Sequence, residues 1–180
     1  MRRAVFVNRV PASGKSTVAS AISAASGWPL LTLDTIKEAF FNVLGTGDRD
    51  YNRRLGKASY EAIFALVSDF PSGAVVVVDA WFGFQPLEIL TQHIQRANLR
   101  HVAEIWCHAP PEVVSQRYLS RVGLRPAGHL GAEYAPELAL LAARAQPTGL
   151  VPAIEVETTH PLELPVLMAT LRERLQLPAD

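Results

Sequence analysis

Short apolar runs alternate along the chain with longer segments whose apolar residues recur at helical spacing. The runs occupy residues 4–7, 30–33, 74–78, 102–107 and 153–156. Alternating strands and helices are typical of a parallel sheet with helices on both faces. The pattern therefore predicts an α/β protein, a three-layer sandwich built on a five-stranded parallel sheet.

Local signals refine this arrangement. Val75–Val78 is apolar at every position, so both faces of this strand should be covered, which predicts a central strand. Thr35 and Glu38 have the spacing of a capping box and predict a helix that begins just after the second strand. Pro111 suits a first helical turn, and we expect that helix to close near Gly123.

The composition is that of one domain able to bury a core. The chain has 180 residues, of which 49% are hydrophobic and 19% charged, and compact domains usually contain roughly 100–200 residues. Basic and acidic residues both number 17, so the formal net charge is zero and there is no global field to attract nucleic acid or an anionic membrane. We expect a single domain over residues 1–180, with its oligomeric state open.

Two further features concern the location of the protein and the state of its single cysteine. No apolar run approaches the ~20 residues of a membrane span, and the residues after Met1 lack the apolar core of a signal peptide. The single cysteine, Cys107, lies in an apolar run and excludes an intrachain disulfide. These features predict a cytoplasmic protein without membrane contact and a buried Cys107 thiol.

The strongest chemical signal is the segment Asn8–Thr17, NRVPASGKST, which lies where the first strand ends and a helix begins. In a phosphate loop, backbone N–H groups and a helix N-terminus face the anion, a lysine reaches the outer phosphates and a hydroxyl helps to hold Mg²⁺. Gly14, Lys15 and Ser16 match the end of the pattern G-x-x-x-x-G-K-[ST], whereas Arg9 replaces its first glycine. The alternative is an incidental Gly-Lys-Ser at a helix start. The residues predicted to bind the nucleotide are Pro11, Ala12, Ser13, Gly14, Lys15, Ser16 and Thr17.

Two aspartates, Asp34 and Asp79, are predicted at the carboxyl ends of the second and third strands, the edge that holds the ligand in open α/β sheets. Phosphoryl transfer needs a carboxylate that orients the attacking hydroxyl and accepts its proton, and we assign this catalytic role to Asp34. The alternative for Asp34 is an N-cap for the helix at Thr35. Asp79, together with Ser16, is predicted to hold Mg²⁺. The alternative for Asp79 is a strand-terminal residue that only turns the chain.

Three arginines are predicted to reach the phosphates. Arg117 and Arg121 are four residues apart, hence on one face of the same predicted helix. Arg125 follows in a lid-like segment around residues 121–135. Arginines clamp phosphates and stabilise charge in the transition state, so we assign catalytic roles to Lys15, Arg121 and Arg125, and nucleotide binding to Arg117. The alternative is a solvated basic face.

Two other groups of side chains have open roles. Trp81, Phe82 and Phe84 follow the third strand and either wall an acceptor pocket or pack in the core. A basic group opens the long helical segment 51–70, and it either meets an anionic acceptor or a nucleic-acid end or forms a solvated face. Its members are Arg49, Arg53, Arg54 and Lys57.

Together these features resemble the P-loop small-molecule kinases, in particular the chloramphenicol phosphotransferase and zeta-toxin type. The resemblance rests on the phosphate loop, Asn8, Leu33-Asp34, Val78-Asp79, the arginine series and the segment 155–160 before a final helix. It implies a nucleotide-kinase-like fold with ATP and Mg²⁺ as cofactors. It also implies transfer of the γ-phosphoryl group to a hydroxyl of a small molecule such as an antibiotic, sugar, aminosugar or nucleoside, with Asp34 as the catalytic aspartate.

Other functions stay open beside this resemblance. Arg9 and Ala12 stand where such loops commonly carry glycine, which leaves the choice between ATP and GTP undecided and allows a nucleotide-binding regulatory domain without transfer activity. A nucleic-acid end kinase is a third reading, and it rests on the basic group near Arg53 alone. Phosphoryl transfer to a small-molecule hydroxyl is the leading prediction.

Overall fold

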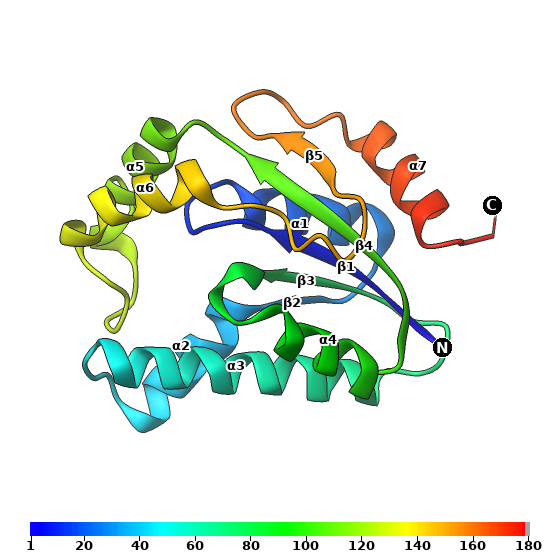
Figure 1. The fold of residues 1–180 in the computed structure, drawn as a ribbon, viewed down its shortest axis with the longest axis horizontal. Helices are drawn as coiled ribbons and strands as arrows, with labels where there is room; N and C mark the ends of the chain where they lie inside the picture. Colours follow the sequence, from blue (N-terminus) through cyan, green and yellow to red (C-terminus); the bar gives the residue numbers. More distant parts are fainter. Residues whose placement is uncertain (179–180) are drawn as a thin grey trace.

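Five parallel strands form one sheet in the order β2-β3-β1-β4-β5 in the computed structural model, which describes residues 1–178 (Figure 1). Helices lie on both faces of this sheet, so the predicted three-layer α/β sandwich is confirmed. The strands are β1 (Arg2–Asn8), β2 (Leu30–Thr32), β3 (Val75–Ala80), β4 (Leu99–His108) and β5 (Ile154–Glu157).

Helices connect the strands and cover the sheet. They are α1 (Lys15–Ser26), α2 (Leu33–Leu44), α3 (Arg49–Asp69), α4 (Leu87–Arg96), α5 (Pro111–Leu119), α6 (Ala135–Arg144) and α7 (Leu164–Arg174). α1 and α7 pack on one face of the sheet, whereas α3 and α4 pack on the other (Figure 1). Within residues 1–178, none of the helices is long and apolar enough to cross a membrane.

Side chains that alternate along β1 build the cores on both faces of the sheet. Val5 and Val7 pack toward α1 and α7, whereas Ala4 and Phe6 pack toward α3 and α4, because successive side chains of a strand point to opposite faces. All four are almost inaccessible to solvent, and full burial of a Val or Phe side chain contributes roughly 1.5–3 kcal/mol. β3 is buried at every position and lies between β2 and β1, as its unbroken apolar run predicts.

The start of α2 differs from the prediction. Thr32, not Thr35, is the N-cap, because its Oγ1 accepts a hydrogen bond from the backbone N–H of Thr35 at 3.1 Å. Thr32 also has the extended backbone of an N-cap residue, with φ −112° and ψ 137°. Glu38 completes no capping box and contacts His129 instead. The strand therefore ends at Thr32, and Asp34 lies inside the first turn of α2.

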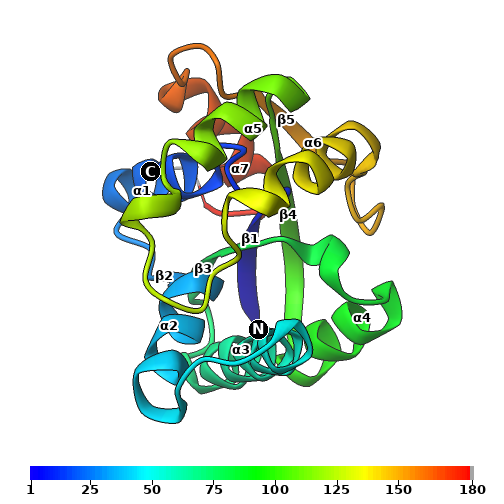
Figure 2. The ribbon, with the colours of Figure 1, turned by 90° about the vertical axis from the view of Figure 1, so that its left-hand side faces the viewer.

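The helix α5 is shorter than predicted. It ends at Leu119 instead of near Gly123, where the N–H of Arg121 bonds to the carbonyl of Tyr118 at 3.1 Å and tightens the last turn. Arg117 and Arg121 therefore do not share one helical face. The segment from α5 to α6 arches over the carboxyl edge of the sheet and reaches α2 (Figure 2).

Candidate functional site

The phosphate loop connects β1 to the start of α1 and is shaped by glycine. Gly14 has a φ of +95°, and a Cβ at this position would lie 2.8 Å from the Cβ of Thr158. Neither the backbone conformation nor the space allows a larger residue. Among the described residues, no side chain caps the N-terminus of α1, so its first N–H groups face the loop without a side-chain acceptor. This is the arrangement in which helix N-termini bind anions.

Lys15, Ser16 and Asp79 converge at the start of α1. The hydroxyl of Ser16 donates a hydrogen bond to Oδ2 of Asp79 at 2.7 Å, and Nζ of Lys15 lies 3.8 Å from Oδ1 of the same carboxylate. Asp79 is only 5% exposed and pairs in register with Val7 of β1, which sets it beside the loop. The fold thus brings together the lysine and the two oxygen donors that the sequence predicts.

The oxygens of Ser16 and Asp79 fit a magnesium ion. Mg²⁺ binds oxygen ligands at about 2.0–2.1 Å in octahedral geometry, so two adjacent ligands lie about 2.9 Å apart. The observed separation of 2.7 Å between Oγ of Ser16 and Oδ2 of Asp79 is close to this value. A hydroxyl and a carboxylate are also the hard oxygen donors that Mg²⁺ prefers.

Thr158 joins Arg117 to the back of the loop, and it is a residue that sequence reasoning missed. Arg117 donates from Nη1 to Oγ1 of Thr158 at 3.0 Å and from Nη2 to its carbonyl at 2.8 Å. The Thr158 hydroxyl donates in turn to the carbonyl of Ser13 at 2.7 Å. Thr158 follows β5, and its only sequence signal is its place in the segment 155–160. The contact fixes the guanidinium of Arg117 at the loop.

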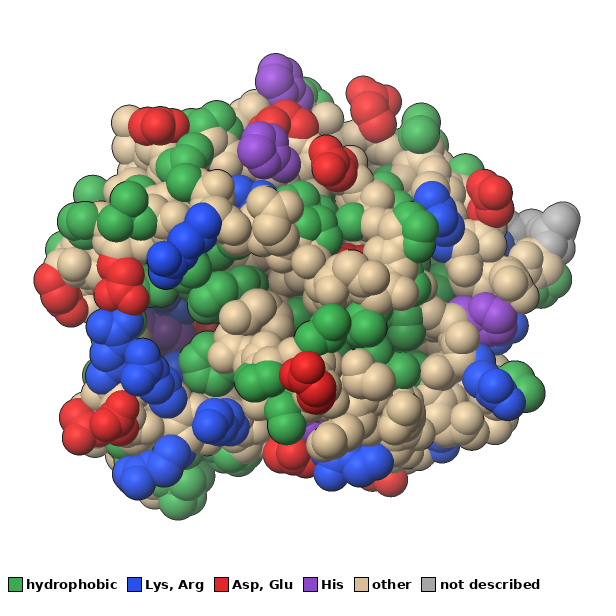
Figure 3. Space-filling view, in the orientation of Figure 1, with side chains coloured by type: hydrophobic (Ala, Val, Ile, Leu, Met, Phe, Trp, Pro, Cys, Tyr) green, Lys and Arg blue, Asp and Glu red, His purple; other side chains and the backbone are tan. Residues whose placement is uncertain are grey.

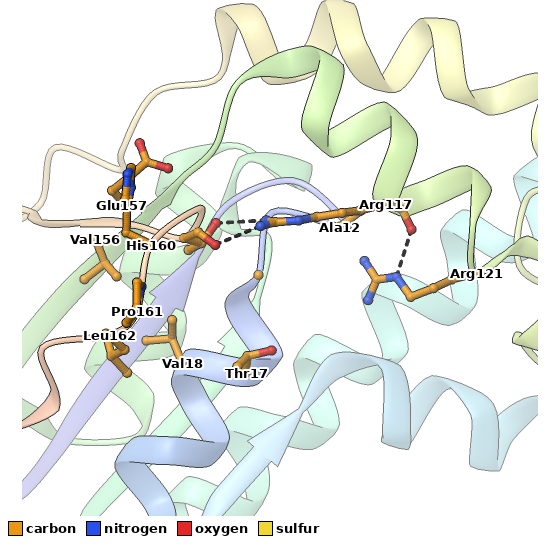
Figure 4. Close-up of a pocket in the computed structure, with 12 residues that line it drawn as sticks. Ala12, Thr17, Val18, Arg117, Arg121, Val156, Glu157, His160, Pro161 and Leu162 are labelled. Atoms are coloured by element: carbon orange, nitrogen blue, oxygen red, sulfur yellow. Dashed lines mark hydrogen bonds between the residues drawn. The ribbon is translucent and has the colours of Figure 1, made fainter.

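A cavity of about 380 Å³ opens beside the loop (Figure 4). Val18 and Leu162 are among its apolar wall residues, and Thr17, Arg117 and Arg121 are among the polar ones. Figure 4 shows Arg117 and Arg121 projecting from the α5 side, across from Val18 and Leu162. Its volume lies within the roughly 300–1,000 Å³ of typical ligand pockets. The cavity therefore has room for a ligand group next to the phosphate loop.

Asp34 contacts one of the arginines predicted to reach the phosphates. Nη2 of Arg125 lies 2.9 Å from Oδ2 of Asp34, and Nε of Arg121 donates to the carbonyl of Arg117 at 3.1 Å. Burial lowers the pKa of Arg121, and the positive charges of Arg125 and Arg117 lower it further, whereas Asp34 raises it. The pKa of Lys37 is also lowered, mainly by burial. The charge of Arg125 lowers it further, whereas the charge of Asp34 partly opposes the shift. Three guanidiniums thus crowd one region, as in an anion site.

The segment 121–135 is fastened to α2 by a histidine. The side chain of His129 is 7% exposed, contacts Oε1 of Glu38 through Nε2 at 2.7 Å and lies edge-on to the Phe41 ring. Burial is the largest of the effects that lower the pKa of His129. In Figure 3, Lys and Arg side chains gather around a hollow at this left-hand edge of the molecule. The segment 121–135 therefore contacts α2 through Arg125 and His129, and its action as a lid stays a prediction.

The aromatic group splits between core and surface. Phe82 is buried, and its ring centroid lies 4.5 Å from that of Phe6. Trp81 and Phe84 are half-buried, and Phe84 stacks on Tyr60, whose hydroxyl donates to the Trp81 carbonyl. Packing is thus confirmed for Phe82, and Phe84 and Trp81 pack from outside against two different core clusters.

The predicted basic group lies along the first turns of α3 and is partly paired. Arg49 contacts Glu137 of α6, and Arg53 lies 3.5 Å from Asp50. Arg54 lies over the ring of Tyr51. These contacts are those of a solvated helix face.

Arg9 is the first residue of the phosphate loop, but its side chain does not lie inside the loop. Its side chain is 4% exposed and turns away from the phosphate site, onto the Trp106 ring and the carbonyl of Ala142. Ala12, the other residue at a position where glycine is common, adopts a φ of 64°. The contacts of Arg9 with Trp106 and Ala142 thus keep its side chain out of the phosphate loop.

Solved structures share this fold over nearly the whole chain. A candidate kinase from Chloroflexus aurantiacus is 27% identical with a TM-score of 0.81, and the match covers 97% of this chain and 99% of that one. A gluconokinase from Sinorhizobium meliloti is 22% identical with a TM-score of 0.57, covering 97% and 89%. A shikimate kinase from Aquifex aeolicus is 19% identical with a TM-score of 0.52, covering 96% and 97%.

The sequence also matches a family model. The comparison with curated proteins gave no match. The model described as an AAA domain matches residues 6–146, a range that holds the phosphate loop, both aspartates and the lid arginines. The chain therefore belongs to the AAA domain family, on a fold that it shares with kinases of small molecules.

Proposed function

We propose that the protein is an ATP- and Mg²⁺-dependent phosphotransferase that moves the γ-phosphoryl group to a hydroxyl of a small molecule. The observation that carries this proposal is the contact between Ser16 and Asp79 beside Lys15, at the N-terminus of α1. Gluconokinase and shikimate kinase among the structural neighbours support a small hydroxylated acceptor. Sugars, aminosugars, nucleosides and antibiotics are the acceptor classes to examine first.

The nucleotide fits along the loop and the cavity. The backbone amides from Val10 to Thr17 and the ammonium of Lys15 bind the phosphates. The base lies in the 380 Å³ cavity between Val18 and Leu162. Arg117, fixed by Thr158, borders both parts.

Ser16 and Asp79 hold the metal ion in this proposal. Bound Mg²⁺ neutralises phosphate charge that develops in the transfer. Nζ of Lys15 lies 3.8 Å from Oδ1 of Asp79, and its ammonium adds a positive charge at the outer phosphates. The three residues therefore act as one charge-stabilising group.

Asp34 serves as the base in the transfer step. A bond forms between the acceptor oxygen and the γ-phosphorus, and the hydroxyl proton passes to a carboxylate oxygen of Asp34. The bond from the γ-phosphorus to the bridging oxygen breaks, and its electron pair leaves with ADP. Arg121 and Arg125 stabilise the charge on the transferred group. The exposed carboxylate of Asp34 in the first turn of α2, next to Arg125, supports this role.

The test is transfer of label from γ-labelled ATP to a panel of hydroxylated metabolites. A thermal-shift screen first selects acceptors that stabilise the ATP-bound protein. We expect Lys15→Ala to abolish transfer and Lys57→Ala, a lysine on the exposed face of α3, to leave it unchanged. Equal transfer by the two variants would refute the proposal. Nucleotide binding without transfer to any acceptor would favour the alternative, a nucleotide-binding regulatory domain.

A further inference from the structure

Arg9 begins the phosphate loop in an unusual backbone conformation. It follows β1 directly, at the position of the first glycine in the phosphate-loop pattern. Its φ of 156° lies in a region that residues with a Cβ rarely occupy. Such a conformation persists where surrounding contacts determine it. The contacts of the Arg9 side chain are therefore a candidate for a specific role.

The guanidinium of Arg9 is buried against two partners. Its Cζ lies 4.6 Å from the centroid of the Trp106 ring, and its Nη2 donates to the carbonyl of Ala142 at 2.7 Å. Burial lowers the pKa of Arg9, while the negative charges of Glu155 and Glu157 raise it. A charge-assisted hydrogen bond is stronger than a neutral one, and here solvent does not compete for it.

The partner carbonyl belongs to the helix that follows the lid. Ala142 lies near the C-terminal end of α6, which begins where the segment 121–135 ends. The carbonyls at this end carry the negative pole of the helix and favour a cation. Val10, the next loop residue, is buried in the cluster formed by α5 and α6, with Val114 and Leu138. Two consecutive loop residues therefore attach to the helices on either side of the lid.

We propose that Arg9 is a positioning residue that ties the phosphate loop to the C-terminal end of α6. The tie holds the loop amides in a fixed relation to the lid arginines, Arg121 and Arg125. A glycine at position 9, as in the general pattern, forms no such tie. The inference rests on the proposed function, because it concerns how the two halves of the phosphate site are held together.

The tie is testable without any nucleotide. Arg9→Gly removes the guanidinium, and glycine adopts the observed backbone freely. We expect amide hydrogen exchange to rise about ten-fold in both residues 10–13 and residues 135–144, and to stay unchanged in β3. Arg144→Ala, an exposed arginine in the last turn of α6, is the control and should leave the loop rates unchanged. Wild-type rates in Arg9→Gly, or a rise that includes β3, would overturn the tie.

A second variant protects the test against misfolding. Arg9→Lys keeps the charge and loses the planar fork that reaches Ala142. It should raise exchange in the same two segments by a smaller factor. Wild-type exchange in Arg9→Lys together with an unfolded Arg9→Gly would show that Arg9 serves stability alone.

Nucleotide titration separates this proposal from the proposed function. In the wild type, Mg-ATP should slow exchange in residues 121–131 as the lid arginines engage phosphate. In Arg9→Gly, the Kd for Mg-ADP should stay within about three-fold, while the slowing of lid exchange by Mg-ATP should fall about ten-fold. Wild-type lid protection in Arg9→Gly would overturn the tie. If the wild type binds neither nucleotide, the proposed function fails, and the exchange rates without nucleotide still decide whether the tie exists.

Discussion

Nη2 of Arg125 lies 2.9 Å from Oδ2 of Asp34 and joins the lid segment to the first turn of α2. The side chain of Asp34 is 60% exposed and that of Arg125 is 22% exposed, so the pair contributes only about 0–1 kcal/mol to stability. Its importance is chemical: it places the proposed base against a proposed phosphate ligand. In the proposed function, we expect the γ-phosphate of a bound nucleotide to compete for Arg125 and to free the carboxylate of Asp34 for the acceptor.

Replacing the proposed base should separate binding from turnover. We expect Asp34→Asn to keep the Kd for Mg-ATP within about two-fold and to lower the transfer kcat by about 10²–10⁴, because the amide cannot accept the hydroxyl proton. Asp50→Asn is a matched control, since Asp50 is an exposed aspartate in the first turn of α3. Calorimetry and single-turnover transfer measure the two quantities. Normal turnover in Asp34→Asn would remove Asp34 as the base.

Replacing either proposed Mg²⁺ ligand should abolish the increase in ATP affinity that Mg²⁺ gives. In the wild type, chelation of Mg²⁺ should weaken ATP binding, because the triphosphate loses a bridging cation. In Ser16→Ala and Asp79→Asn, which each lack one oxygen donor, the ATP affinity should be nearly the same with and without Mg²⁺. The comparison is a calorimetric titration of each protein with ATP, with and without chelator. An unchanged magnesium effect in both variants would place the ion elsewhere.

Two glycines with positive φ offer a paired test of the loop. Gly14→Ala would set a Cβ 2.8 Å from Thr158, whereas Gly27→Ala, at a φ of +71°, meets nothing within 4 Å. Both substitutions strain the backbone, which costs on the order of 1–3 kcal/mol in the free energy of unfolding. Only Gly14→Ala should also weaken nucleotide binding. Chemical denaturation and calorimetry on both variants check this, and equal nucleotide affinity in the two would contradict the assigned loop geometry.

The buried cysteine should be chemically silent in the folded protein. Cys107 is fully buried, and burial raises the pKa of its thiol to about 12. A charged thiol reagent at pH 8 should therefore label the protein only in denaturant. Because the unfolded thiol ionises first, this group lowers stability as the pH rises above its ordinary value of 9.0 toward 12, and has no effect at pH 7. Rapid labelling of the native protein would contradict the burial of Cys107.

The apolar pattern was sufficient to predict the sheet and the strand positions, because unbroken runs such as Val75–Val78 need cover on both faces. Strand order was not predictable, since β1 pairs with β3 and β4 through contacts distant in sequence. The cap of α2 was misplaced by three residues. Thr32 and Thr35 are both acceptable N-caps by residue type, and only the extended backbone of Thr32 decides between them.

The site residues also differ in whether the sequence alone could predict them. Gly14, Lys15 and Ser16 carry a local motif, and the parallel sheet brings Asp79 beside them. Thr158 has no such motif, because its contacts to Arg117 and Ser13 join segments far apart in the sequence. The direction of the Arg9 side chain likewise depends on Trp106 and α6, so residue type alone could not show that the loop stays open.

Calorimetric titration of the wild-type protein with Mg-ATP and, separately, with AMP examines whether the loop binds a polyphosphate tail. The two ligands share base, sugar and α-phosphate, and differ in the phosphates assigned to Lys15 and the loop amides. We expect Mg-ATP to bind at least about 100-fold more tightly than AMP, a difference of about 2.7 kcal/mol. Equal affinities, or no heat with any purine triphosphate, would contradict the assignment of residues 10–17 as the phosphate site.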